Sequence, residues 1–316
     1  MKFVNPFNFG LNKSTTTKKT PLHQGICQIP IWFLLTFLFW SPSDGGKVLV
    51  IPLDGSHWLS MRLVLERLHQ RGHEIVVIAP DVRMRIKPSI HYTLKTFAVP
   101  YGEEYMKEEV KQFGQKAFSQ QPFLAEMTEM IATTRHITTR FFNTCKQLLY
   151  NKEIIAYLEG NQFDVVFTVP VSPCGQILAE HLSLPSVYYS RGFHCGLEAT
   201  QCPNLPSYVP EYFTGYTDHM DFNQRVKNFL ISRLGFLMCS LLYSSFNILS
   251  TEFLQREVTV HELYSQASIW LLRYDFAFEY PRPLMPNMVL IGGIHCEKKA
   301  PLIQVGIALN VTHTYS

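Results

Sequence analysis

His57 is the residue best placed to do acid–base chemistry. It comes directly after the turn residues 54–56, which follow the apolar run 48–51. A histidine held beside a hydroxyl group can remove its proton and so make the oxygen a stronger nucleophile. If a helix begins at this turn, the positive end of its dipole disfavours imidazolium and helps to keep the base neutral at pH 7. From position alone, however, a lone histidine in a turn is more often structural than catalytic.

A β-α-β unit is predicted to position His57. The continuous apolar run 48–51 is typical of a parallel strand that is covered on both faces, and 74–79 reads as a second strand. Between them, apolar residues recur with the spacing of one helix face, at Met61, Val64, Leu65 and Leu68. Gly72 then favours a helix end. The pattern predicts a Rossmann-like parallel α/β sheet with helices on both faces. His57 would lie at the strand-to-helix turn, where ligands meet such sheets.

Further apolar segments extend this sheet and its helices. Short strands are predicted at 163–168, 185–189, 269–273 and 288–291, and most of 81–160 is predicted to be helical. Residues 222–255 are predicted to form an amphipathic helix. Arg233 and several serines within it argue against a membrane span, although one face could rest on a membrane surface.

Aromatic and methionine side chains in the helical region are candidates for an apolar binding site. At helical spacing such residues usually form core, but methionine-rich surfaces also adapt to varied apolar ligands. The set comprises Phe113, Phe118, Phe123, Met127, Met130, Phe141 and Phe142. Arg191 follows a predicted strand and lies at the expected site edge, where it could contact the same ligand.

The cysteines and charges exclude several other functions. Seven cysteines occur without a Cys-x-x-Cys pair, so no zinc or other metal site is expected. Cys195 and Cys202 could form a disulfide, or both could be free buried thiols. The net charge of +3 is dispersed, which argues against nucleic-acid binding. No glycine-rich loop follows the first strand to cradle a phosphate.

The N-terminal segment reads as a secretory signal. Polar residues 1–28 precede an apolar stretch at 29–40, and small residues follow at 41–43. The apolar stretch is well short of the ~20 residues that span a membrane, although a retained anchor is an alternative. This predicts transfer into the endoplasmic reticulum lumen. Asn310 begins a glycosylation sequon near the other end of the chain.

Several motifs in order resemble the vertebrate UDP-glucuronosyltransferases of family 1. Residues 54–61 read Asp-Gly-Ser-His-Trp-Leu-Ser-Met and resemble the first family signature. Further matches occur at 199–203 (Ala-Thr-Gln-Cys-Pro), 207–210 (Ser-Tyr-Val-Pro), 218–220, 281–288 and 292–294. The resemblance runs from about 46 to about 304 and covers only the N-terminal half of such an enzyme.

The resemblance implies a two-domain glycosyltransferase fold of the GT-B type. It predicts a leader at 1–43, an acceptor-binding domain at 44–296 and a divergent tail at 297–316. The complete enzyme would transfer glucuronic acid from UDP-glucuronic acid to small lipophilic phenols, alcohols, amines or acids. In the family the second domain makes most contacts to that co-substrate, so no cofactor is expected on this half. Family members are associated with the endoplasmic reticulum membrane, and homo- or hetero-oligomers with other transferases are expected partners.

The resemblance also assigns roles to residues. The histidine matching His57 is the family's general base, and an aspartate in a Thr-Asp-Pro motif orients it. Here that motif reads Thr168-Val169-Pro170, and a valine cannot accept the imidazole N–H. By analogy with serine proteases, losing such a group costs about 10⁴-fold in turnover. The matching helical region helps to hold the acceptor, which gives Phe113, Phe118, Met127 and Phe141 a possible binding role.

Two other functions stay open. The chain could be a non-catalytic partner that binds lipophilic ligands or regulates intact transferases, which the missing aspartate favours. It could also be a secreted carrier of apolar ligands. A chain with Asp at position 169 would instead favour the enzyme.

Overall fold

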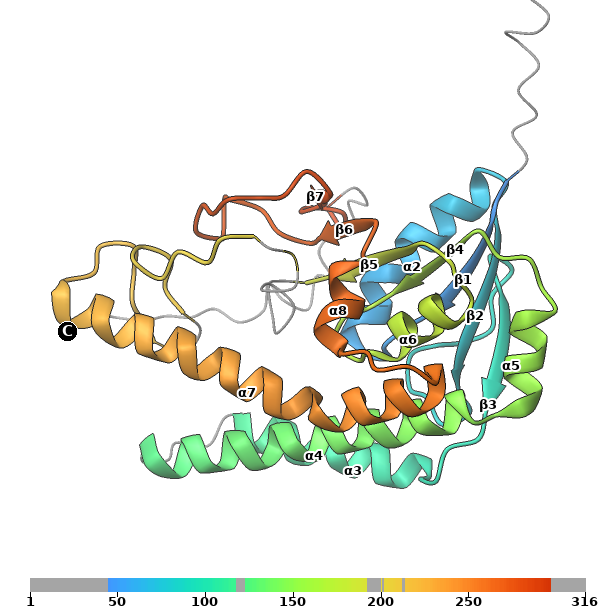
Figure 1. Ribbon diagram of the computed structural model, residues 1–316, viewed down its shortest axis with the longest axis horizontal. Coiled ribbons are helices and arrows are strands. Elements are labelled where there is room, and N and C mark those ends of the chain that lie inside the picture. Colours follow the sequence, from blue (N-terminus) through green and yellow to red (C-terminus); the bar gives the residue numbers. More distant parts are fainter. Residues whose placement is uncertain (1–44, 118–122, 192–199, 201, 212–213, 297–316) are drawn as a thin grey trace, which may run out of the picture. The chain divides into compact units, whose positions relative to one another are not determined.

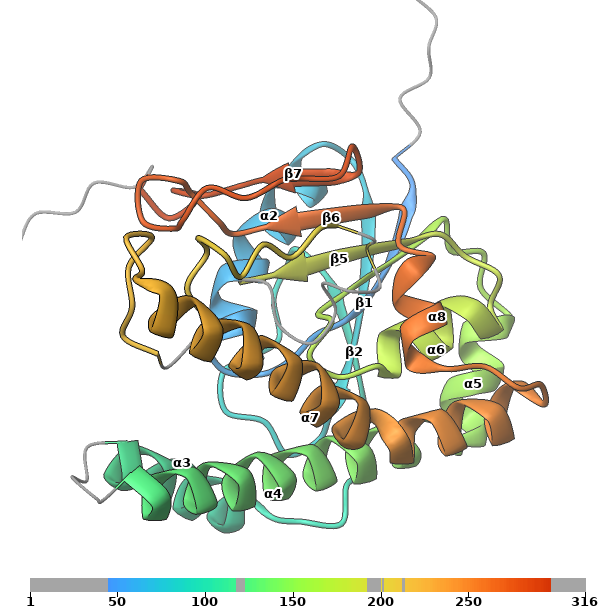
Figure 2. The ribbon, with the colours of Figure 1, turned by 60° about the vertical axis from the view of Figure 1, so that its left-hand side comes forward.

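A parallel sheet of seven strands organises the described part of the chain. The computed structural model describes residues 45–117, 123–191, 200, 202–211 and 214–296. The strands lie in the order β3-β2-β1-β4-β5-β6-β7, and every neighbouring pair is parallel (Figures 1 and 2). They are β1 (Lys47–Ile51), β2 (Glu74–Pro80), β3 (Thr93–Phe97), β4 (Val165–Thr168), β5 (Ser186–Ser190), β6 (Ile269–Leu272) and β7 (Met288–Leu290). The predicted parallel α/β sheet is confirmed.

Helices connect the strands and cover both faces of the sheet. They are α2 (Ser56–Gln70), α3 (Glu103–Ala117), α4 (Phe123–Leu149), α5 (Lys152–Glu159), α6 (Cys174–His181), α7 (Phe222–Leu254) and α8 (Val260–Ser265). Because successive strand residues point to opposite faces, Leu49 and Val76 pack with α4 to α8, whereas Val48 and Val50 pack with α2. The expectation of helices on both faces is therefore also confirmed.

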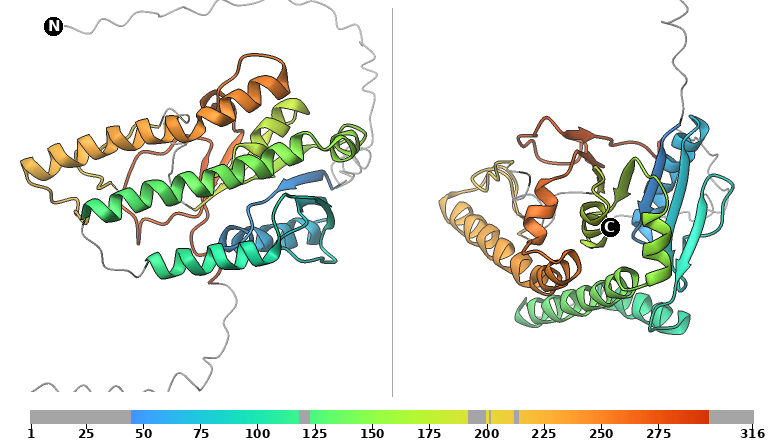
Figure 3. Two further views of the ribbon diagram at one scale, coloured as in Figure 1. Left: turned by 90° about the horizontal axis from the view of Figure 1, so that it is seen from below. Right: turned by 45° about the vertical axis from the view of Figure 1, so that its right-hand side comes forward.

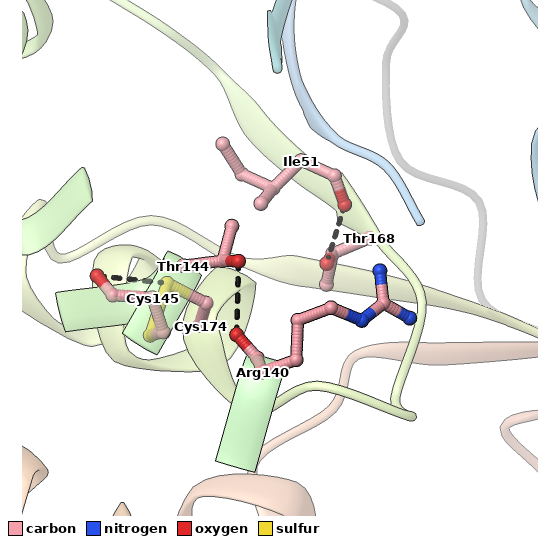
Figure 4. Close-up of a disulfide and its surroundings, with 6 residues drawn as sticks. All are labelled: Ile51, Arg140, Thr144, Cys145, Thr168 and Cys174. Atoms are coloured by element: carbon pink, nitrogen blue, oxygen red, sulfur yellow. Dashed lines mark hydrogen bonds between the residues drawn. A yellow bond between two sulfur atoms is a disulfide. The ribbon is translucent and has the colours of Figure 1, made fainter. Parts of the chain in front are cut away.

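The chain reverses its direction of travel across the sheet at β1. From β1 it proceeds to β2 and β3, and it then crosses back to place β4 on the other side of β1. Ile51 and Thr168, the last residues of β1 and β4, are register partners, and Thr168 Oγ1 donates a hydrogen bond of 2.9 Å to the Ile51 carbonyl (Figure 4). The loops that leave these two strands therefore start side by side, which is the usual place for a ligand on an open α/β sheet.

A disulfide ties two helices together behind these loops. Cys145 of α4 is bonded to Cys174 of α6, and their Cα atoms are 5.4 Å apart (Figure 4). Cys239 of α7 is also disulfide-bonded. Cys202 instead has a free, buried thiol that donates to the Pro283 carbonyl at 3.0 Å. The alternative of a Cys195–Cys202 disulfide is thus wrong for Cys202, while Cys195 lies outside the described residues.

Helix α7 is unusual because most of its apolar side chains are exposed. A capping box of Asp221 and Gln224 starts the helix, which runs beside α4 and contacts it through Phe246 and Phe142, whose ring centroids are 5.5 Å apart (Figure 3). Exposed apolar residues include Phe229, Leu230, Leu234, Phe236, Leu237 and Leu241. The helix predicted at 222–255 is confirmed, but its apolar side chains are not gathered on one face, so the prediction that it is amphipathic is wrong.

The same helix passes a test for membrane spans. Among the described helices, α7 is long and apolar enough to cross a membrane by its length and composition, and only 6% of its most apolar window is buried. Helix α7 contributes few side chains to the core. Four of its residues are buried, and two of these, Asn228 and Ser250, are polar.

Candidate functional site

The turn after β1 is fixed by a carboxylate. Asp54 accepts hydrogen bonds from its neighbour Gly55 at 2.7 Å and from the backbone N–H groups of Met84 and Arg85 at 2.5 and 3.0 Å. Gly55 has φ +91°, a left-handed conformation that suits glycine. Asp54 thereby joins the start of α2 to the segment after β2. This anchors His57, the second residue of α2, which is partly buried.

Val169 occupies the neighbouring position on the sheet edge. It directly follows β4 and is 2% exposed, packed in the apolar cluster that contains Trp58 and Tyr189. His57 and Val169 thus stand on loops that leave adjacent strands. A buried valine side chain has no atom that can accept a hydrogen bond, so position 169 cannot orient an imidazole.

A largely apolar pocket opens at the same edge. It encloses about 80 Å³ and lies among the ends of β1, β2, β3 and β4, helix α4 and the start of α6. Its apolar walls include Ile51, Leu53, Ile78, Val82, Phe97, Phe141, Leu148 and Val169. Its charged lining residues are Asp54 and Arg140, and both disulfide cysteines also line it. Such a pocket suits a small apolar ligand with one polar group.

The predicted acceptor contacts are only partly brought together here. Phe141 lines the pocket. Phe113 on α3 is 55% exposed and does not line it. Phe118 lies outside the described residues, as does the side chain of Met127. Outside them too lie the leader at 1–43, the tail at 297–316 and Asn310.

Arg191 belongs to a different group, which we call the cationic cluster: Arg191, Arg273 and His295. Arg191 follows β5 and donates to Ser56 Oγ at 2.7 Å, beside His57. Arg273 follows β6 and donates to Ser60 Oγ at 2.7 Å, and the His295 Nε2 atom lies 3.0 Å from the same hydroxyl. Arg191 is not brought together with Phe141, since it is not among the described residues that line the pocket and its side chain is held against the first turn of α2.

The cationic cluster is electropositive. In the described part of the chain neither guanidinium forms a salt bridge; serine hydroxyls hold both. Desolvation, and then the positive charges of Arg273 and Arg191, lower the pKa of His295. Paired guanidinium groups beside a helix N-terminus suit a carboxylate or phosphate. Arg273 and His295 were missed in the sequence analysis, because Arg273 was placed inside the strand predicted at 269–273 and His295 lies beyond the end of the strand predicted at 288–291.

No metal centre is evident within the described ranges. There, no group of three or more histidine, cysteine, aspartate or glutamate side chains could hold a metal ion. What the site offers is a small apolar pocket, a histidine at its edge and a cationic cluster beyond that histidine.

Known proteins resemble the chain along most of its length. The family model of UDP-glucoronosyl and UDP-glucosyl transferases matches residues 46–308. The chain is 46% identical over 283 residues to UDP-glucuronosyltransferase 1A1 of Homo sapiens, an alignment covering 89% of this chain and 53% of that protein. UDP-glucuronosyltransferase 1A6 of Homo sapiens is 45% identical over 267 residues, with coverages of 84% and 50%. Among solved structures, the glycotransferase of kitacinnamycin has 12% identity and a TM-score of 0.44, over 78% of this chain and 51% of that one. The chain spans about half the length of the curated relatives it matches.

Proposed function

Because the chain belongs to the family of UDP-glucuronosyl and UDP-glucosyl transferases, we propose that it is the acceptor-binding half of a glucuronosyltransferase. The acceptor would be a small lipophilic phenol, alcohol, amine or acid held in the pocket, and UDP-glucuronic acid would be the co-substrate of the complete enzyme. The observation that carries the proposal is the apolar pocket at the carboxyl ends of β1 and β4, beside the turn that holds His57.

The proposed chemistry is a single displacement with His57 as general base. The imidazole takes the proton of the acceptor hydroxyl while its oxygen attacks the anomeric carbon and UDP leaves. The aspartate that would stabilise the imidazolium is replaced by Val169, which is buried among apolar side chains. Turnover by this route should therefore be low. The cationic cluster supports an anionic co-substrate, because its arginines lack acidic partners among the described residues.

A fusion to the second domain of a close relative tests this function. With a phenol that stays un-ionised at the assay pH as acceptor, Val169→Asp should raise kcat by orders of magnitude with a smaller effect on KM, because the aspartate acts mainly on charge developed in the transition state. His57→Ala in the restored fusion should remove most of that gain. An unchanged phenol turnover in a folded, donor-competent Val169→Asp fusion would show that the roles of positions 57 and 169 are wrong.

A non-catalytic role is the second candidate. The buried Val169 favours it, since the pocket can bind a ligand without the group that would complete the base. A chain that binds phenols, stays inactive when fused, and changes the activity of an intact transferase would support this role. An active Val169→Asp fusion alone would not distinguish the two, so the native valine must be assayed beside it.

The proposed location is the lumen of the endoplasmic reticulum. Residues 1–43 would direct transfer, residues 44–296 would fold there, and Asn310 in the tail would be glycosylated. The Cys145–Cys174 disulfide supports an oxidising compartment, and the exposed apolar side chains of α7 support contact with the membrane surface. Translation with microsomes should give a protease-protected, endoglycosidase-sensitive product; a fully protease-accessible chain would contradict the location.

A further inference from the structure

Arg140 places a positive charge in the wall of the acceptor pocket. It lies on α4, one residue before Phe141, and its guanidinium carbon is 5.0 Å from the centre of the Phe141 ring. Figure 4 shows its side chain extending from α4 toward Thr168, the last residue of β4. The guanidinium group of arginine is cationic and offers hydrogen-bond donors but no acceptor.

The guanidinium retains unused hydrogen-bonding capacity. Arg140 Nη1 donates to the Met106 sulfur at 3.3 Å, and Nε lies 3.0 Å from Glu109 Oε2. The Nε contact is close, but it lacks the alignment of a hydrogen bond, so this buried N–H has no aligned acceptor among the described residues. A guanidinium carries five N–H donors, and the Nη1 contact to Met106 is the one hydrogen bond that the Arg140 guanidinium forms with a described residue.

Of the two acidic groups near Arg140, Glu109 is not among the pocket-lining residues and Asp54 is hydrogen-bonded to the backbone. Glu109 also lies 3.2 Å from His136 Nδ1 and has a side chain that is 14% exposed, behind the pocket wall rather than lining it. Asp54 lines the pocket, but its carboxylate accepts three backbone N–H groups. Neither carboxylate therefore offers a hydrogen-bond acceptor directed at a ligand, whereas Arg140 offers donors.

We propose that the pocket selects acceptors that bind as anions, namely carboxylic acids and acidic phenols, with Arg140 contacting the charged oxygen. The inference rests on the proposed function and deepens it. An oxygen that is already ionised needs no general base. Its lone pair forms the bond to the anomeric carbon, the carbon–oxygen bond to the diphosphate breaks, and UDP leaves with that electron pair while no proton moves. Such acceptors would be the ones least affected by Val169.

Ligand binding to the full chain tests the inference without any turnover. Benzoate and its neutral isostere benzamide are titrated by calorimetry. Benzoate should bind about tenfold more tightly, since a hydrogen bond to a charged partner is worth about that factor. Arg140→Gln should weaken benzoate binding about tenfold and change benzamide binding less than twofold. Arg135→Gln, an exposed arginine on the same helix that does not line the pocket, is the matched control and should change neither.

A second variant separates recognition from folding. Glu109→Gln removes the carboxylate that competes for Arg140, so benzoate should bind several-fold more tightly than to the native chain. If Arg140 were only structural, both substitutions would weaken both ligands. Equal affinity of the native chain for benzoate and benzamide overturns the anion inference and leaves the acceptor pocket standing. Absence of binding by either ligand overturns both, and a fusion that binds benzoate but transfers no sugar refutes the proposed function alone.

Discussion

Removing the Cys145–Cys174 disulfide should strongly lower the free energy of unfolding of the α/β domain. The two cysteines are separated by 29 residues, and the chain-entropy relation gives about 12 cal/mol/K for closing such a loop, or about 3.6 kcal/mol at 25 °C. Both side chains are buried, at 2% and 5% exposure, so alanine is the better replacement because a buried serine hydroxyl would add its own penalty. For a domain of 150–250 residues the loss corresponds to roughly 7–14 °C in Tm.

This loss of stability is measured by urea unfolding, monitored by circular dichroism. Without reductant, the double variant Cys145→Ala/Cys174→Ala should unfold at a lower urea concentration than the native chain. Excess reductant should lower the midpoint of the native chain at least as far, because it also breaks the disulfide of Cys239. Cys296→Ala removes a free, exposed cysteine and should leave stability unchanged. A loss below about 1 kcal/mol would refute the reasoning, since it lies far under the chain-entropy value. Because both cysteines line the pocket, the same variants should also bind benzamide more weakly.

Three further predictions concern other parts of the fold. Gly175→Ala would place Cβ 2.1 Å from the side-chain oxygen of Thr168, so we expect a loss of about 1–3 kcal/mol in urea unfolding; native stability would show that the helix simply shifts. Asn228→Ala should destabilise by about 3 kcal/mol or more, because this fully buried amide serves two backbone carbonyls and one backbone N–H; thermal unfolding checks it. Arg273→Gln should raise the pKa of His295 towards its usual value by removing a neighbouring positive charge; an NMR titration with an unmoved midpoint would contradict the cationic cluster.

The β-α-β unit around His57 could be predicted from the sequence because its signals are local. The apolar run before residue 52 and the helical stripe that follows need only short windows, and α2 indeed ends at Gln70, shortly before Gly72. The seven-stranded order was not predicted, since it depends on crossovers between distant segments. The general rule for parallel sheets placed the expected ligand edge at the strand ends, and the apolar pocket opens there.

The missed features depend on contacts between residues far apart in the sequence. No local pattern pairs Cys145 with Cys174, because the helices that carry them meet only after the sheet has formed. Arg140 sits in a helix of mixed polarity, where nothing in the spacing marks it as facing a pocket. The prediction that α7 is amphipathic was wrong for a different reason. Its apolar residues lie around the whole helix axis, so their spacing could not show which of them would be buried.

The apolar pocket and the cationic cluster are formed by separate segments of the chain. All described residues that line the pocket fall between positions 51 and 174. The cationic cluster comes from 191 to 295, and within the described part of the chain it reaches back to the hydroxyl groups of Ser56 and Ser60 on α2. A single recombination between paralogous genes, anywhere within 175–190, would exchange the whole pocket as one block. The arginines and the histidine beyond it would pass unchanged to the recombinant, which would need only two serines on the incoming helix to hold them. Acceptor choice can thus diversify in such a chain by shuffling one contiguous segment, without rebuilding the edge that would face a charged co-substrate.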